Sequence, residues 1–322
     1  TRTYRAIFDN QRRVQDGLID ARLKRYVERF GAGYITDKDP DLRVAYVSGL
    51  PAAALADAKV QVARTALWWR TQVLPDGVSL VGTDEQPAPW VVVILPTRHD
   101  YQAWAISMVG DRADRLGGMY IHDQRELYAQ DIGDSLRHEF AHALHHRHMA
   151  QIGRLAPMWI QEGLCSLPED VRVEPSVPPR EGEAPDVQAL TPVPSWRSNT
   201  VRRMARIGNL PRWATFMKMD DDKFMAQRAL GNYAVARTIF LYLQDRGQLR
   251  AWYVDYTAPD QDDASGMKSL ASVLKRPLAD VEKDWKKWLA ALPEVQEPGF
   301  GTTRLPFDVD DRAADGVRVE ST

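Results

Sequence analysis

The chain has 322 residues, of which 44% are hydrophobic and ten are tryptophan. This length and composition indicate a globular protein with one large core or two fused cores. The 42 basic and 44 acidic residues give a net charge of −2, without the positive excess that is typical of nucleic-acid-binding proteins. No apolar run approaches the 18 residues of a membrane-spanning helix, so we expect no membrane span.

The N-terminal part of the chain has helical periodicity. Two helical patterns cover residues 14–30 and 55–73, and a strand-like run at 42–47 lies between them. We interpret residues 1–85 as an N-terminal accessory lobe.

The next part alternates between strand and helix signals. A β-branched run at 90–95 ends at Pro96 and predicts a buried strand. A helix is expected at 99–109, and two short strands at 118–122 and 126–129 flank a polar turn. The edge strand of such a sheet can bind an extended peptide as an additional strand.

A helix with two histidines follows this hairpin. His138 and His142 are four residues apart, so both imidazoles project from one side of the helix and can reach one metal ion. The carboxylate of Glu139 can accept a proton from a water molecule that such a metal activates at neutral pH. Apolar residues at the helical spacing place this pattern on a helix, with Asp134 or Ser135 as the expected N-cap.

Glu162 supplies a third ligand. Nineteen residues separate it from His142, which is enough to end the first helix, turn at Gly153 and begin a second helix at Pro157. Glu162 then lies in the second turn of that helix, where its carboxylate can reach the same metal. The only cysteine, Cys165, excludes an internal disulfide; we expect a small buried residue, with a thiol near the metal as the alternative.

These segments resemble the gluzincin metallopeptidases, the clan of thermolysin and the M1 aminopeptidases, and most closely the peptidase MA-like group. The resemblance is carried by Arg137–His142, by Pro157–Leu164 and by Glu169. It implies that His138, His142 and Glu162 bind Zn²⁺ and that Glu139 is the general base. Glu169, seven residues after the third ligand, matches an acidic position on the same helical face and is expected to be a hydrogen-bond partner of a ligand. Many members of this group are exported, so the resemblance implies a periplasmic or secreted protein.

The resemblance continues more weakly toward the C-terminus. Residues 231–247 are similar to the helix that follows the zinc site in this group, and residues 278–289 are similar to its closing helix. The Gly-Ala-Met-Glu-Asn loop by which M1 enzymes capture a substrate amino group is absent. The nearest match is Gly117-Gly118-Met119-Tyr120, which lacks the acidic residue and argues against aminopeptidase activity.

We therefore expect an α+β fold with a zincin-like catalytic domain, consisting of a small mixed sheet and the active-site helix, and a mainly helical C-terminal lobe. The helical patterns of that lobe cover residues 201–207, 213–218, 223–230, 233–245, 249–256, 267–274 and 278–292. The expected organisation is an accessory lobe at 1–85, the catalytic lobe at 86–170, a proline-rich loop at 171–198, the helical lobe at 199–293, and a tail or the start of a further domain at 294–322.

The sequence leaves several roles open. Peptide hydrolysis needs a hydrogen-bond donor for the oxyanion, and by resemblance to M1 enzymes we select Tyr233, with His122 and His99 as alternatives. Three further histidines follow the metal pattern. His145 lies near the same helical face, whereas His146 and His148 are assigned to an exposed side beside Arg147. The alternative explanation is a second metal ion or a histidine-rich patch that stores metal ions.

The expected function is zinc-dependent hydrolysis of peptide bonds in a peptide or protein substrate. The alternative is a zincin-fold module that binds a peptide or protein without turnover. Degenerate members are expected to lose a ligand or the base, and this chain retains His138, Glu139, His142 and Glu162. The sequence does not determine the oligomeric state.

Overall fold

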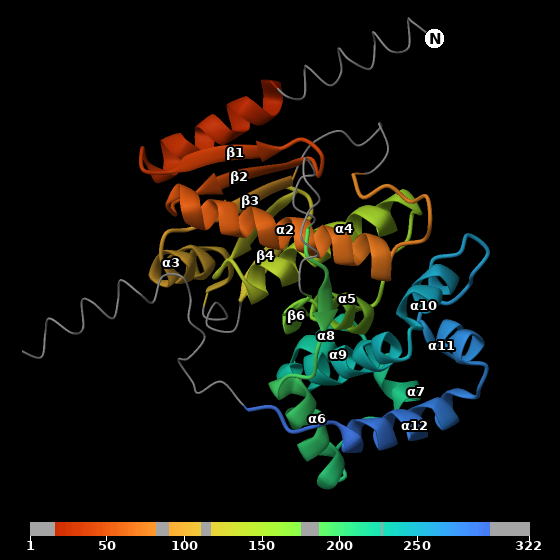
Figure 1. Cartoon of the computed structure of the whole chain (residues 1–322). Coiled ribbons are helices and arrows are strands. Elements are labelled where there is room, and N and C mark those ends of the chain that lie inside the picture. The colour runs from red at the N-terminus through yellow and green to blue at the C-terminus, as the bar shows by residue number, and fades with distance from the viewer. Residues whose placement is uncertain (1–16, 82–89, 111–116, 175–186, 227, 297–322) are drawn as a thin grey trace, which may run out of the picture. The chain divides into compact units, whose positions relative to one another are not determined.

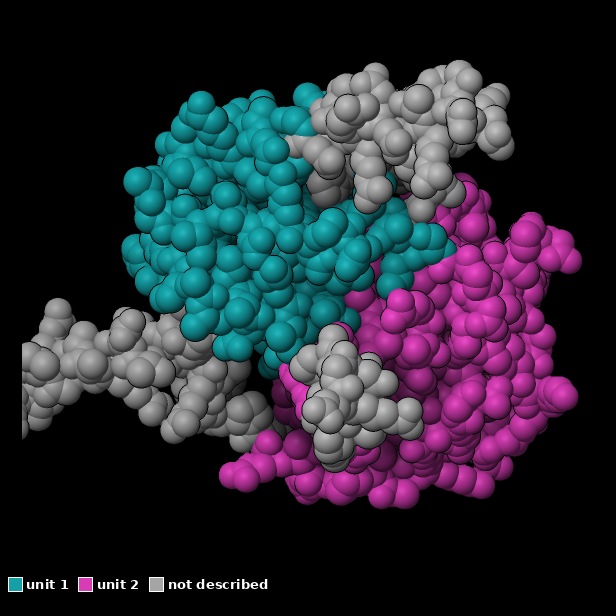
Figure 2. All heavy atoms as spheres, turned by 45° about the horizontal axis from the view of Figure 1, so that its top comes forward, with its two compact units in different colours: residues 1–63, 79–143, 303–322 teal, residues 64–78, 144–302 magenta. Residues whose placement is uncertain are grey.

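The computed structural model describes residues 17–81, 90–110, 117–174, 187–226 and 228–296 (Figure 1). The chain divides into two compact units. Unit 1 comprises Thr1–Ala63, Ser79–Ala143 and Thr303–Thr322, and unit 2 comprises Arg64–Val78 and Leu144–Thr302 (Figure 2). Helices predominate, and the larger of the two sheets has five strands of mixed direction in the described residues. This confirms the expected α+β class.

Unit 1 contains a five-stranded sheet in the order β1-β2-β3-β5-β4. Its strands are β1 (Ile35–Asp39), β2 (Val44–Ser48), β3 (Trp90–Ile94), β4 (Gly118–Ile121) and β5 (Glu126–Ala129). The three central strands are parallel, and β1 and β4 are antiparallel to their neighbours at the two edges. The sequence predicted β2 to β5 but not β1, whose Asp and Lys residues give no apolar strand pattern. Strands β1 and β2 come from the predicted accessory lobe and belong to the same sheet as β3.

Both faces of this sheet are covered within unit 1. A helix at residues 17–30 and α3 (Arg98–Val109) pack on one face, where Val47, Val93 and Tyr128 join their core. On the other face, Trp90 packs edge-to-face against Phe140 of α4 (Asp134–Gln151), with ring centroids 6.1 Å apart. The part of α2 (Ala52–Gln72) that belongs to unit 1 contacts this second face too, because the ammonium of Lys59 lies 6.0 Å from the centre of the Tyr46 ring.

Unit 2 is built around α9 (Ala229–Asp245), which is buried over most of its length. The helices α5 (Met158–Cys165) and α6 (Trp196–Arg206) pack against it. Trp159 of α5 stacks on Phe240 of α9 with ring centroids 5.1 Å apart. The helices predicted for this part of the chain are confirmed, and the remaining ones are α7 (Trp213–Phe216), α8 (Asp221–Ala226), α10 (Leu249–Tyr256), α11 (Met267–Leu274) and α12 (Leu278–Ala291).

The proline-rich segment differs in part from the predicted loop. Its ends form a two-stranded antiparallel sheet of β6 (Val171–Val173) and β7 (Leu190–Pro192). The sequence missed these strands because each is only three residues long and prolines surround them. A capping box at Ser195 then begins α6. Residues 175–186, and the predicted tail from residue 297 onward, lie outside the described residues.

Within the described ranges, no helix combines the length and the hydropathy that a membrane span requires.

Candidate metal centre

The start of the helix that carries the two histidines is capped by a carboxylate that was not predicted from the sequence, Asp131. The side chain of Asp131 accepts hydrogen bonds from the backbone N–H groups of Gly133 and Ser135, at 2.8 and 3.2 Å, and from the Ser135 hydroxyl at 2.6 Å. The prediction of Asp134 or Ser135 as N-cap was therefore wrong, because both lie inside the first turn of α4. Asp131 satisfies N–H groups that a helix start leaves without an intrahelical partner.

His138, His142 and Glu162 form a group of ligand atoms suited to one metal ion. These atoms all lie within 4.8 Å of one another. The Nε2 atoms of His138 and His142 are 3.0 Å apart, close to the roughly 3.3 Å expected for two ligands of a tetrahedral zinc with bonds of about 2.0–2.1 Å. Two imidazoles and a carboxylate are a typical ligand set of catalytic zinc, so the donor chemistry fits this metal. His142 and Glu162 are buried, whereas His138 is partly exposed, which leaves one ligand accessible from solvent.

Glu139 lies directly against the edge strand β4. A Cβ atom added to Gly118, the first residue of β4, would lie 2.4 Å from Cγ and 2.5 Å from Oε1 of Glu139. Only glycine leaves room for this carboxylate, because real Cβ atoms do not approach other atoms so closely. From the sequence, Gly118 was considered only in the comparison with the M1 loop, and this role was not predicted. A glycine at the start of a strand is a signal of close approach by another group.

The buried side chain of Tyr101, on α3, interacts electrostatically with Glu139 and Asp131. Burial raises the pKa of the Tyr101 phenol well above its usual value, and the negative charges of Glu139 and Asp131 raise it further. Tyr101 is therefore protonated at neutral pH and adds no charge near the proposed base.

The third ligand is positioned by a short helix with strong tertiary packing. As predicted, α5 begins after Pro157, whose carbonyl accepts the backbone N–H groups of Ile160 and Gln161. At Gly163, a Cβ atom would lie 2.6 Å from the Phe240 ring and 2.9 Å from a backbone oxygen of α9, so glycine allows the two helices to approach closely. Glu162 is thus held on a helix that is fixed against α9.

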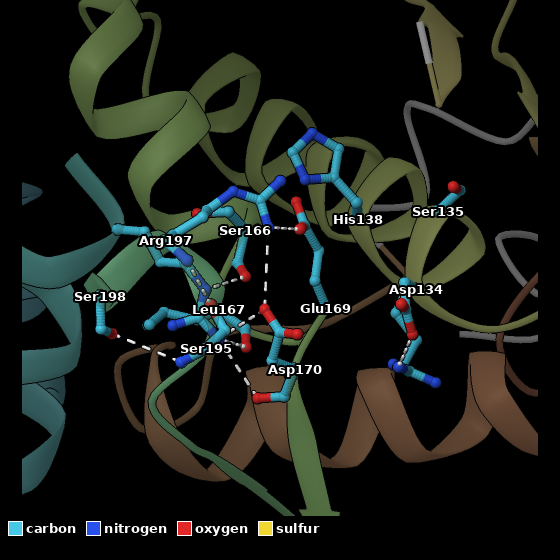
Figure 3. A network of polar contacts seen from close by, with 12 residues as sticks. Asp134, Ser135, His138, Ser166, Leu167, Glu169, Asp170, Ser195, Arg197 and Ser198 are labelled. Carbon is cyan, nitrogen blue, oxygen red and sulfur yellow. Dashed lines mark hydrogen bonds and ion pairs between the residues drawn. The ribbon is translucent and has the colours of Figure 1, made fainter. Parts of the chain in front are cut away.

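Glu169 lies in a charged network just after α5 (Figure 3). The guanidinium of Arg197 donates to the Glu169 carboxylate, and it also lies 3.7 Å from Oδ2 of Asp170. Ser195 and Ser198, also drawn in Figure 3, bond to each other at the start of α6, the helix that carries Arg197. Because α5 ends at Cys165, Glu169 does not lie on the same helical face as Glu162, and that part of the prediction was wrong. Its expected role as a partner of a metal ligand stays a prediction.

Arg237 is the main polar residue of this region that the sequence analysis missed. It lies in the middle of α9 and is fully buried. Its guanidinium donates to the backbone carbonyls of four residues, at 3.0 to 3.3 Å: Ser166, Leu167, Asp170 and Val193. A lone arginine inside the apolar run from Ala234 to Leu243 was the available signal, since a buried guanidinium requires partners.

Tyr233, the predicted oxyanion donor, lies in the second turn of α9. Its hydroxyl bonds to Sδ of Met225 at 3.5 Å, and its ring lies 5.5 Å from that of Phe224. The alternatives lie in unit 1: His99 in the first turn of α3, and His122 directly after β4. The donor role of Tyr233 stays a prediction.

Two of the three residues assigned to an exposed side of α4 are buried. His148 and Arg147 are buried, so their assignment was wrong, whereas His146 is partly exposed. The hydroxyl of Tyr253 lies 3.2 Å from Nδ1 of His145 and 3.0 Å from Nδ1 of His148. Burial lowers the pKa of His148 to about 4. Within the described ranges, the ligand group His138–His142–Glu162 includes none of these histidines.

Cys165 is fully buried, as expected for a small helix residue.

In comparisons with known proteins, no family model and no curated protein matches the chain. The functional assignment therefore depends on the chemistry of the site.

Proposed function

We propose that this protein is a zinc-dependent peptidase of the gluzincin type with a zincin-like catalytic fold. The observation that supports it is the grouping of His138, His142 and Glu162 within 4.8 Å, with Glu139 on the same helix as the two histidines. The mixed sheet with α4 packed on one face is consistent with this fold.

In the proposed reaction, the two imidazoles and the Glu162 carboxylate would hold the metal. Zinc at this site would supply a water molecule with a pKa of about 7 and a Lewis acid for the substrate carbonyl group. Glu139 accepts the proton of the attacking water and passes it to the leaving amine, which requires its carboxylate to stay in one position. Gly118 provides the space for that position. Tyr233 is the proposed donor to the oxyanion.

The substrate class follows from the position of β4. It is the outermost strand of the five-stranded sheet on the side next to β5. An extended peptide that pairs with this strand has its backbone aligned by main-chain hydrogen bonds. Because the first residue of β4 contacts Glu139, such a peptide passes the proposed base. This geometry favours a peptide bond over a small ester or amide.

The proposal is tested with the purified protein and with Glu139→Gln. We expect about one zinc per chain in both proteins by inductively coupled plasma mass spectrometry. In a digest of a proteome-derived peptide library, we expect cleavage by the wild type and a loss of several orders of magnitude in Glu139→Gln, because only proton transfer is removed. His142→Ala is the control that loses both zinc and activity.

Three results would contradict the proposal in different ways. Near-normal turnover by Glu139→Gln excludes Glu139 as the base. Peptide binding without cleavage by the zinc-loaded wild type supports the alternative, a binding module. Several metal ions per chain support metal storage instead.

A further inference from the structure

Unit 1 contains a pocket of about 350 Å³ between the helix at residues 17–30, α3 and the β4–β5 hairpin. This volume falls within the range of small-ligand sites. Three arginines from one stripe of the helix line it, namely Arg22, Arg25 and Arg29. Its walls also include apolar and aromatic side chains: Tyr26, Trp104, Met108, Ile121 and Tyr128. Guanidinium groups beside an apolar wall match an anionic group attached to an apolar chain.

The charges of the pocket are not balanced within its lining. Three guanidinium groups face one carboxylate, Glu126, which gives a net lining charge of +2. Glu126 is already engaged, because it forms an ion pair with Arg22 and accepts a hydrogen bond from the Tyr128 hydroxyl at 3.0 Å. Arg25 and Arg29 are exposed and one helical turn apart, and neither pairs with a carboxylate of the described residues. These two guanidinium groups can therefore bind one external anion together.

The pocket is continuous with the strand proposed to bind substrate. Gly118, at the start of β4, contacts Glu139, whereas Ile121, at its end, lines the pocket. Three residues of antiparallel strand span about 10 Å. Ile121 also packs against the core on the face covered by α3, opposite to the face of Gly118 and Glu139. Side chains of a paired peptide alternate between the same two faces. A peptide residue about three positions from the one beside Glu139 thus faces the pocket.

We propose that this pocket binds the side-chain carboxylate of an acidic residue in the peptide substrate, about three residues from the cleaved bond. This inference rests on the proposed peptidase function and adds a substrate preference to it. A free phosphate ion would use the arginines but not the apolar wall. A peptide uses both, because the methylene groups of a glutamate and the flanking residue can cover Met108 and Ile121.

The test uses pairs of fluorogenic peptides, identical except for Glu or Gln at one position two to four residues on either side of the cleaved bond. Two partly exposed ion pairs predict a preference for Glu of about fivefold in kcat/KM for the wild type. Arg25→Glu combined with Arg29→Glu is expected to abolish or reverse it. Lys24→Glu is the matched control for Arg25→Glu, because Lys24 lies on the same helix and is exposed but does not line the pocket.

Binding is measured separately with the Glu139→Gln protein and the same peptides labelled for fluorescence anisotropy. Tighter binding of the Glu peptide that disappears in the arginine variants, and that weakens at high salt, supports the pocket even if no peptide is cleaved. If this binding is observed but no peptide is cleaved, the peptidase function is contradicted and the pocket proposal is not. Equal kcat/KM and equal binding of the Glu and Gln peptides at every position overturns the pocket proposal. A preference that Lys24→Glu removes as strongly as Arg25→Glu overturns it as well.

Discussion

Replacement of Gly118 by alanine tests the contact between β4 and the proposed base. The added methyl group would lie 2.4 to 2.7 Å from three atoms of the Glu139 side chain. Ordinary contact begins at 3.4 Å, so the carboxylate must move by about 1 Å. A displacement of this size at a reacting group costs about 10²-fold in rate, or about 2.7 kcal/mol in the activation free energy. Stability should change by less than about 1–3 kcal/mol, the usual cost of overpacking, because the displaced atoms belong to a flexible side chain.

The assay compares kcat/KM, zinc content and thermal unfolding of Gly118→Ala with those of the wild type. We expect zinc to be retained, because the methyl group approaches the base and none of the predicted ligands. Gly33→Ala is the control: Gly33 has no atom within 4 Å of an added Cβ and should leave all three quantities unchanged. If Gly118→Ala keeps its zinc and a normal kcat/KM, the position of Glu139 does not control the reaction, and its role as base is refuted.

Three further variants test other parts of the site. Tyr233→Phe should lower kcat by about 10²–10³-fold with little change in KM if Tyr233 stabilises the oxyanion. If steady-state kinetics show an unchanged kcat, His122 or His99 becomes the candidate donor instead. His148 has a folded-state pKa of about 4, below its usual value, because of burial. The unfolded chain therefore binds the proton more readily, so the free energy of unfolding should fall by about 2–3 kcal/mol as the pH decreases from 6.5 to 4. His148→Gln should flatten that slope in urea titrations, and an unchanged slope would assign the pH dependence to other groups. Arg237→Lys should lower the free energy of unfolding by about 3 kcal/mol and weaken zinc binding, because an ammonium group cannot reach four carbonyls. The control is Arg246→Lys, because Arg246 is exposed.

Helix periodicity was sufficient to predict that the candidate metal ligands lie on the helices α4 and α5. His138 and His142 are one turn apart on any α-helix, and Pro157 marks where the next helix begins. Both signals are local, so no knowledge of tertiary structure was needed. The buried strand β3 was predicted for the same reason, because five consecutive apolar residues have few other locations in a folded protein.

The features that the sequence did not predict depend on contacts between distant residues. Strand β1 has the sequence Ile-Thr-Asp-Lys-Asp and exists because it pairs with β2. His148 is polar, and its burial depends on Tyr253, which lies 105 residues further along the chain. The pairing of β1 and the burial of His148 are determined by the fold as a whole. From the local sequence alone, polar residues are expected to be exposed and outside a strand.

The position of Glu162 in the proposed site also depends on contacts between residues that are distant in the sequence. A helix of eight residues is not stable by itself, and α5 has no side-chain N-cap to support it. Its N-terminal part is held by the stacking of Trp159 on Phe240, and the segment after it by the bonds from Arg237 to the carbonyls of Ser166 and Leu167. Both anchors belong to α9. Substitutions on the face of α9 that packs against α5 should therefore change zinc affinity before they change the fold, although none of those residues is expected to touch the metal.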